Sequence, residues 1–197
     1  MNDSKPLFLT VDFINDLVHP DGKMAGCAPM VMACGVIARS NEALHWARAQ
    51  GFHIGHVKVA LVAGTSTTLG SWSMFGKADQ IGALQLGGWG TAFHQELDVH
   101  PDELVIVKPR VSAFYGTPLE SLLRTKNIRQ LVLAGVSTCH AIDLTAREAH
   151  DRDLRVTVLS DCCAARSLDQ HRATLSGALS QVAQVRTLDE VRACMKD

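Results

Sequence analysis

The chain has 197 residues, enough for one α/β domain, and 47% of them are hydrophobic. Its formal net charge of −1 argues against nucleic acid or an anionic membrane as its main partner. Its six cysteines form no CxxC pair, which favours reduced thiols in a cytoplasmic protein. The polar start and the lack of a long apolar run predict neither a signal peptide nor a membrane span.

The first third of the chain predicts a strand, a helix and a second strand. Leu7–Val11 is a short apolar run that is closed by Asp12. Residues 29–50 place apolar side chains at helical spacing, and Gly51 is a suitable stop. Residues 53–60 predict the second strand. Its two histidines are three positions apart and so point to opposite faces, which makes them a poor metal pair.

Residues 61–95 show little periodicity. A long irregular segment in a compact domain is usually a functional loop or a packed excursion. Its aromatic side chains are therefore candidates to wall a pocket, although they can equally cover the core. These aromatic residues are Trp72, Phe75, Trp89 and Phe93.

The rest of the chain alternates strands and helices. A third strand over residues 103–108 is closed by Lys108, and Thr117-Pro118-Leu119-Glu120 predicts a helix start. The alternation predicts one domain over residues 1–197, with a three-layer α/β/α, Rossmann-like fold and a central, mainly parallel sheet. The later elements are strands over 131–135, over 154–159 ending at Asp161, and from Val185, with helices from Ser167 or Asp169 to Val182 and over 188–195.

Three strand ends carry chemically useful groups, namely Asp12, Lys108 and the turn over residues 135–141. Because the carboxyl ends of parallel strands meet at one edge of a sheet, these groups can converge. The carboxylate can move a proton, the ammonium can hold a negative charge, and backbone amides in the turn can receive an oxyanion. A thiolate at Cys139 would be favoured by the helix start and the lysine. The pattern predicts an amide or ester hydrolase.

Three segments also carry a family resemblance. They cover residues 11–16, 107–117 and 135–149, and residues 161–165 and His171 extend them. With these segments the chain resembles the isochorismatase-like hydrolase superfamily, which includes nicotinamidases, carbamoylsarcosine-type amidases and isochorismatases.

The resemblance implies roles for particular residues. Asp12 and Lys108 match the acid and base positions of the family, and the backbone amides of Ser137 and Ala141 match its oxyanion site. It further implies a non-proline cis peptide before Ser137 and a homo-oligomer, a dimer or tetramer. Nicotinamidases carry an Asp-x-His metal pattern after the second strand, whereas residues 58–62 here read Lys-Val-Ala-Leu-Val. We therefore expect no metal site and no cofactor.

One position departs from the family pattern, whose turn reads G-V-x-T-x-x-C-V-x-x-T-A. Thr138 and Thr145 fix the register on both sides, so Ala141 stands where the nucleophilic cysteine is usual. Cys139 lies two residues earlier, about 200° around a helix from Ala141. We interpret Cys139 as a small turn residue rather than as the nucleophile.

The leading hypothesis is a hydrolase without a cysteine nucleophile, with Asp12 as general acid or base and Lys108 as its electrostatic partner. Its substrate would be a small, cyclic or planar molecule. The alternatives are a cysteine amidase that uses Cys139, a catalytically retired protein that binds a small molecule, and an alanine engineered at position 141. The predicted pocket walls are Phe13, Trp72, Trp89, Phe114 and Tyr115, with Arg110 as a candidate partner of a substrate carboxylate.

Overall fold

Strand β1 (Leu7–Val11) is buried along its whole length, as expected for a parallel strand whose two faces are both covered. In the computed structural model, which describes residues 4–62, 70 and 72–194, it lies inside a six-stranded sheet with the order β3-β2-β1-β4-β5-β6. Every pairing between the described strands is parallel. The other strands are β2 (His53–Val59), β3 (Leu104–Lys108), β4 (Gln130–Val136), β5 (Arg155–Ala164) and β6 (Gln184–Arg186).

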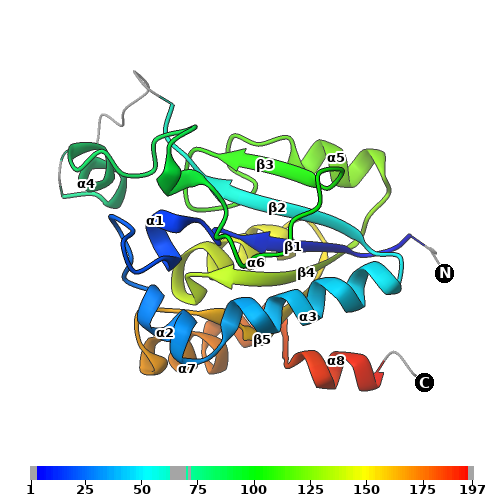
Figure 1. The fold of residues 1–197 in the computed structure, drawn as a ribbon. Coiled ribbons are helices and arrows are strands. Elements are labelled where there is room, and N and C mark those ends of the chain that lie inside the picture. The colour runs from blue at the N-terminus through cyan, green and yellow to red at the C-terminus, as the bar shows by residue number, and fades with distance from the viewer. Residues whose placement is uncertain (1–3, 63–69, 71, 195–197) are drawn as a thin grey trace.

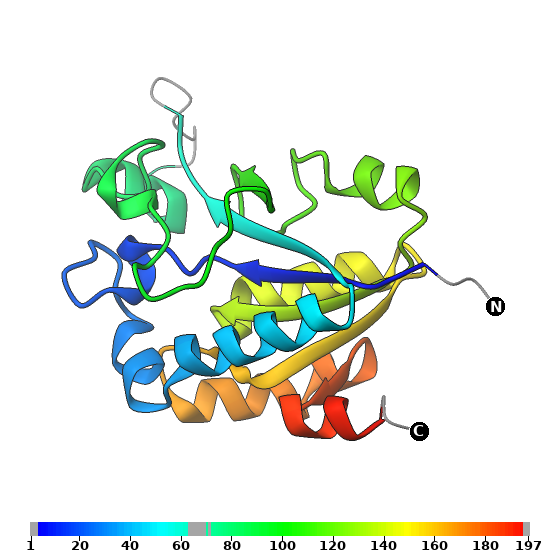
Figure 2. The same cartoon turned by 45° about the vertical axis from the view of Figure 1, so that its right-hand side comes forward.

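Helices cover both faces of this sheet, which confirms the three-layer prediction (Figure 1). Phe8 and Val132 point to one face and pack with the first helical layer, while Leu9 and Leu133 point to the other. Figure 2 shows the sheet between α3 on one side and α6 on the other. The first layer holds α2 (Ala28–Ala33), α3 (Val36–Ala49) and α8 (Leu188–Cys194), and the second holds α5 (Leu119–Thr125), α6 (Asp143–His150) and η3 (Ala178–Gln181).

Three predicted elements differ clearly from the structure. The helix predicted from Ser167 or Asp169 to Val182 is α7 (Leu168–Ser176) and η3, with Gly177 between them. The single helix predicted over residues 29–50 is two helices, because Gly35 adopts a left-handed conformation with φ 61° between α2 and α3. Strand β5 continues to Ala164, beyond the predicted end at Asp161. Its pairing with β4 shifts register, so that a short stretch of β4 lies opposite a longer stretch of β5. Such a bulge lets a strand absorb extra residues and continue.

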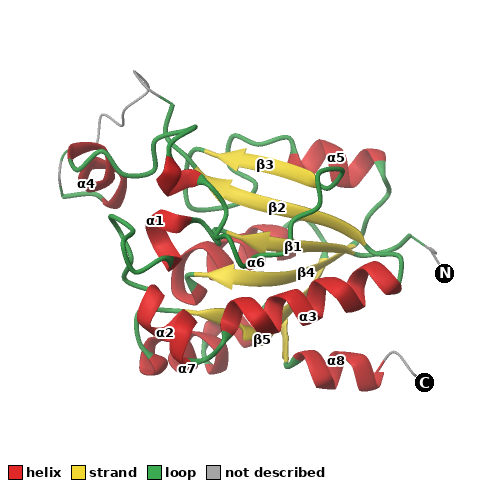
Figure 3. Ribbon diagram, viewed as in Figure 1, coloured by secondary structure: helices red, strands yellow, loops and turns green. Residues whose placement is uncertain are grey.

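The segment over residues 61–95 is partly helical. It contains α4 (Met74–Gln80), whose N-cap Ser73 accepts a hydrogen bond from the backbone of Gly76, and the short helix η1 (Trp89–Thr91). Residues 63–69 and 71 of this segment lie outside the described part of the chain. Short helices and loops, including α1 (Asn15–Val18) and α4, gather beyond the carboxyl ends of the strands (Figure 3).

Helix α7 (Leu168–Ser176) follows β5 and packs against η3 and against residues 138–142, which precede α6. None of the helices within the described residues combines the length and the apolar character needed to cross a bilayer.

Candidate active site

The order in which the chain adds strands to the sheet reverses between β1 and β4. The chain passes from β1 outward to β3 on one side, and β4 then returns to pair with β1 on the other. Ligands of open α/β proteins bind beyond the strand ends at this kind of switch point. Val11 pairs with Gly135, and a Cβ atom at Gly135 would collide with the carbonyl group of Val11. Glycine therefore lets the two strand ends close up beside Asp12.

Asp12 is held in place by its own backbone and by its neighbours. Its φ of 60° is left-handed, a conformation that is uncommon for a residue with a side chain. Its amide donates to the carbonyl of Val57 over 2.8 Å, and its Oδ1 accepts the backbone N–H of Val59 over 2.7 Å. Strained backbone of this kind is concentrated at functional sites.

Lys108 and Asp12 form an ion pair away from solvent. The Lys108 Nζ lies 2.7 Å from Asp12 Oδ2, and the two side chains are 1% and 4% exposed. The same Nζ donates to the carbonyls of Val111 (2.8 Å) and Arg110 (3.2 Å), so each ammonium proton has an acceptor. Burial raises the pKa of the Asp12 carboxyl, while the Lys108 ammonium and the Val59 amide act in the opposite direction. The pair is thus rigid and its carboxyl retains a proton more readily than an exposed aspartate.

The turn after β4 has the predicted backbone. The peptide bond between Val136 and Ser137 is cis, as the family resemblance implied. A short π-helical segment, η2 (Thr138–Ile142), then leads into α6. The Thr138 hydroxyl lies 2.9 Å from Nδ1 of the buried His171 on α7, a contact that fixes the turn against the next layer.

A cavity of about 90 Å³ brings together the groups at these strand ends. Asp12, Lys108, Ser137 and Ala141 all line it, as the predicted convergence required. This volume is several times the space that one water molecule needs. Its walls are largely apolar and include Leu17, Met24, Val59, Phe75, Leu84 and Val111.

Cys139 does not line this cavity, whereas its neighbours Ser137, His140 and Ala141 do. Its side chain is half-buried, and its Sγ lies 3.1 Å from Ser137 Oγ and 3.3 Å from His140 Nδ1. The thiol therefore contacts two residues that line the cavity without lining it itself. This orientation agrees with the expectation that Cys139 and Ala141 face different directions.

The predicted pocket walls need correction. The six side chains predicted to line the pocket all lie outside the lining of the cavity, namely Phe13, Trp72, Trp89, Arg110, Phe114 and Tyr115. Phe13 is fully buried in the core beside α3, and Phe114 is buried in the core of the opposite layer. Trp72 is 77% exposed. Trp89 packs edge-on against His19, and Arg110 and Tyr115 border a separate hollow beyond β2 and β3. The Arg110 guanidinium lies over the ring of Phe75.

Three titratable residues of the cavity were not predicted from the sequence, namely Cys27, His140 and Arg166. Burial raises the pKa of the Cys27 thiol to about 11, so this cysteine is a weak nucleophile at neutral pH. Arg166 follows β5 by two residues. The same strand-end argument that found Asp12 and Lys108 would have found Arg166 if the end of β5 had been predicted correctly.

The described side chains offer no evident metal site. Within residues 4–62, 70 and 72–194, no group of three or more His, Cys, Asp or Glu side chains is arranged to hold a metal ion. The chemistry that the cavity residues themselves supply is a fixed carboxyl, a buried ammonium and, at its edge, a guanidinium.

Comparison with known families agrees with this architecture. A family model described as "Isochorismatase domain" matches residues 6–190. An uncharacterised isochorismatase family protein from Escherichia coli O157:H7 is 35% identical over 89 residues, which are 45% of this chain and 47% of that protein. A ureidoacrylate amidohydrolase from Methylorubrum extorquens is 40% identical over 78 residues, 40% of this chain and 32% of that enzyme. The match thus spans about a third to a half of these relatives.

Solved structures match over a longer range. An isochorismatase-like hydrolase from Alkaliphilus metalliredigens has a TM-score of 0.80 and 26% identity, covering 98% of both chains. An N-carbamoylsarcosine amidase from Thermoplasma acidophilum has a TM-score of 0.76 and 24% identity, covering 94% of this chain and 97% of that one. At this identity the second likeness supports the fold alone.

Proposed function

The chain belongs to the isochorismatase family, and on that premise we propose that it is a hydrolase of a small organic substrate in which Asp12 transfers the proton. The observation that carries the proposal is the buried Asp12–Lys108 pair, which lines a cavity together with Ala141. An alanine has no nucleophilic atom, so the chemistry falls to the carboxyl group and to water.

The proposed reaction is hydrolysis of a vinyl ether. Asp12 in its protonated form gives its proton to the alkene carbon, which leaves a cation stabilised by the ether oxygen. Water adds to that cation and returns a proton to Asp12, and the resulting hemiketal separates into a carbonyl compound and an alcohol. The Lys108 ammonium stabilises the carboxylate that exists between the two proton transfers. The raised pKa of Asp12 favours the protonated form that the first step needs.

The size and lining of the cavity favour a compact substrate. A volume of about 90 Å³ between apolar side chains suits a small cyclic or planar molecule. We assign the backbone amides of Ser137 and Ala141 to a substrate oxygen, by analogy with the family's oxyanion site.

A second candidate is a cysteine amidase that uses Cys139. The observation in its favour is the contact of 3.3 Å between Cys139 Sγ and His140 Nδ1, since a neighbouring imidazole can accept the thiol proton. The similar protein from Methylorubrum extorquens is a ureidoacrylate amidohydrolase. Against it stands the orientation of the thiol, which would have to turn toward the cavity before it could attack.

The test is a turnover assay of the purified chain with small vinyl ethers, amides and ureides. We expect turnover of a vinyl ether, a loss of about 10²- to 10⁴-fold in Asp12→Asn, and no loss in Cys139→Ser. Turnover of an amide or ureide that disappears in Cys139→Ser would establish the second candidate instead. A folded wild-type protein that turns over none of these compounds, together with amidase activity gained in Ala141→Cys, would indicate a retired enzyme.

A further inference from the structure

Arg166 occupies a special position among the cavity residues. It follows the carboxyl end of β5 and lines the same cavity as Asp12 and Lys108, but its side chain is exposed. It therefore stands where the cavity meets solvent. A substrate in the cavity can therefore reach this guanidinium.

The Arg166 guanidinium has no hydrogen-bond or ion-pair partner among the described residues. Arg39 and Arg48, by contrast, each contact two or more carboxylates. A guanidinium carries five N–H donors in a planar fork that matches a carboxylate. An arginine at a cavity mouth with all of these donors open is equipped to bind an anion.

The charge of the cavity points in the same direction. Asp12, which lies 2.7 Å from Lys108, is the one acidic side chain among the described lining residues, so it can offset at most the charge of Lys108. Among the described lining residues, Arg166 then adds one positive charge that no acidic side chain balances. A substrate with a single negative charge would balance it.

The neighbouring backbone leaves room for the arginine. A Cβ atom built at Gly26 would lie 2.9 Å from Arg166 Nε and 3.3 Å from its Cγ. Any larger residue at position 26 would displace the side chain. The glycine thus allows Arg166 to lie against the loop between α1 and α2, beside the cavity.

We propose that Arg166 binds a carboxylate of the substrate, so that the site accepts small monocarboxylic acids with an apolar body. The carboxylate lies at the mouth on Arg166, and the reacting group lies deeper, beside Asp12. The inference deepens the proposed hydrolase, since it uses the same cavity. Arg166 thereby takes the role that the sequence had suggested for Arg110. The Arg110 guanidinium lies over Phe75 and donates to the carbonyl of Pro109.

The test uses benzoate and its uncharged counterpart benzyl alcohol as probes, with dissociation constants measured by NMR titration. In the wild-type chain we expect benzoate to bind more tightly than benzyl alcohol. Arg166→Gln should weaken benzoate binding by about tenfold or more and leave benzyl alcohol within twofold. Arg172→Gln is the matched control, because Arg172 is another exposed arginine close by and does not line the cavity.

Equal benzoate affinity in the wild type and in Arg166→Gln would overturn the inference, as would tighter binding of benzyl alcohol than of benzoate to the wild type. The readout is binding, so it separates this inference from the proposed hydrolase. Arg166-dependent benzoate binding without turnover of any tested compound would refute the hydrolase alone. Turnover of neutral compounds, together with benzoate binding that is unchanged in Arg166→Gln, would refute the carboxylate site alone.

Discussion

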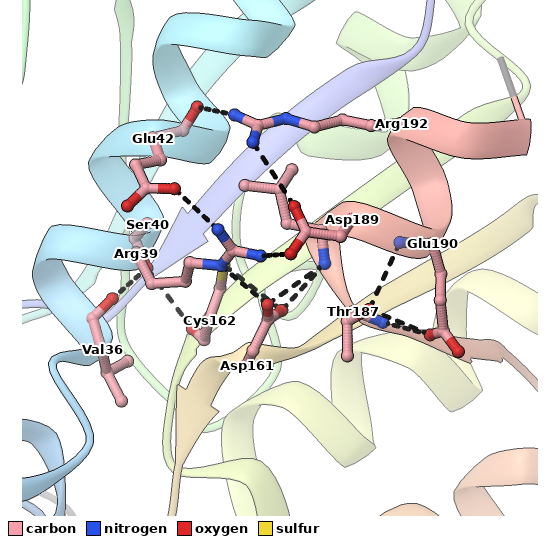
Figure 4. A network of polar contacts seen from close by, with 11 residues as sticks. Val36, Arg39, Ser40, Glu42, Asp161, Cys162, Thr187, Asp189, Glu190 and Arg192 are labelled. Carbon is pink, nitrogen blue, oxygen red and sulfur yellow. Dashed lines mark hydrogen bonds and ion pairs between the residues drawn. The ribbon is translucent and has the colours of Figure 1, made fainter. Parts of the chain in front are cut away.

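The Asp12–Lys108 pair at the cavity and the network around Arg39 are both short ion pairs, but their surroundings differ. Arg39 on α3 contacts three carboxylates, at 2.8 Å from Asp161 on β5, 2.6 Å from Glu42 on α3 and 2.7 Å from Asp189 on α8 (Figure 4). Its side chain is 22% exposed. Lys108 has one carboxylate partner and almost no exposure.

The difference separates a structural role from a catalytic one. The Arg39 network joins three elements, and Asp161 also accepts the backbone N–H of Leu188 at the start of α8. Water screens these charges, so each contact contributes modestly and the network as a whole holds α8 in place. Burial of Asp12 and Lys108 carries a large desolvation penalty, and a fold gains little stability from such a pair over apolar side chains. Its position in a cavity gives the pair a chemical use.

The largest effect is expected from Lys108→Met. Asp12 then becomes a buried carboxyl without its cation, and we expect the unfolding free energy at neutral pH to fall by about 3–5 kcal/mol. Turnover should fall by about 10³-fold, which corresponds to about 4 kcal/mol in the barrier. Urea unfolding and a turnover assay measure the two quantities.

The double variant Asp12→Asn with Lys108→Met sharpens this test. Removing both charges should restore most of the lost stability while turnover stays low. If the single variant kept its activity, or if the double variant recovered it, the pair would be structural and the contrast with Arg39 would disappear.

A smaller effect with the opposite pattern is expected from Arg39→Met. We expect the unfolding free energy to fall by about 1–3 kcal/mol, because three carboxylates lose their common partner, and turnover to stay within twofold. Arg192→Met is the control, since Arg192 has one carboxylate partner, Asp189 on the same helix at 3.6 Å, besides a hydrogen bond of 3.2 Å to the Glu42 carbonyl. A loss of about 1 kcal/mol or less is expected for it. A loss of turnover in Arg39→Met without a loss of stability would contradict the structural role.

The fold and the central pair followed from the sequence because both depend on local patterns. An apolar run that is closed by a charge marks a strand end, and parallel strands bring their ends to one edge. That argument placed Asp12 and Lys108 correctly. It missed Arg166 because Ser160 and Asp161 look like the end of β5, whereas the bulge against β4 carries the strand on to Ala164.

The walls of the cavity depend on packing that the sequence does not encode locally. Phe13 follows Asp12 directly, so it was expected to face the cavity as well. The backbone at Asp12 is left-handed, and the Phe13 side chain packs into the core instead. Residues 61–95 have no periodicity from which to tell an inward aromatic from an outward one. Phe75 on α4 lines the cavity while Trp72 is exposed.

A third cluster of charged residues, formed by Glu103, Arg48 and His56, shows how the comparison depends on pH. Glu103 is reached by Arg48 Nε over 2.7 Å and lies 2.9 Å from His56 Nε2, and its side chain is 9% exposed. Burial alone would raise the pKa of Glu103, but the hydrogen bonds from Arg48 and His56 outweigh it and lower the pKa to about 2. Glu103 thus differs from Asp12, whose pKa is raised.

The last expected effect concerns this carboxylate, and it is lost in acid. Because its folded pKa lies below its usual 4.5, its stabilisation is complete above pH 4.5 and is lost as the pH falls toward 2, by on the order of 3 kcal/mol in total. Urea unfolding of the wild type and Glu103→Gln from pH 6 to pH 2.5 tests this. The variant should lack that part of the decline, so the two curves converge in acid. A constant difference across this range would show that Glu103 stabilises the fold by packing, and Asp98→Asn, which loses a more exposed partner of the same Arg48, should converge less.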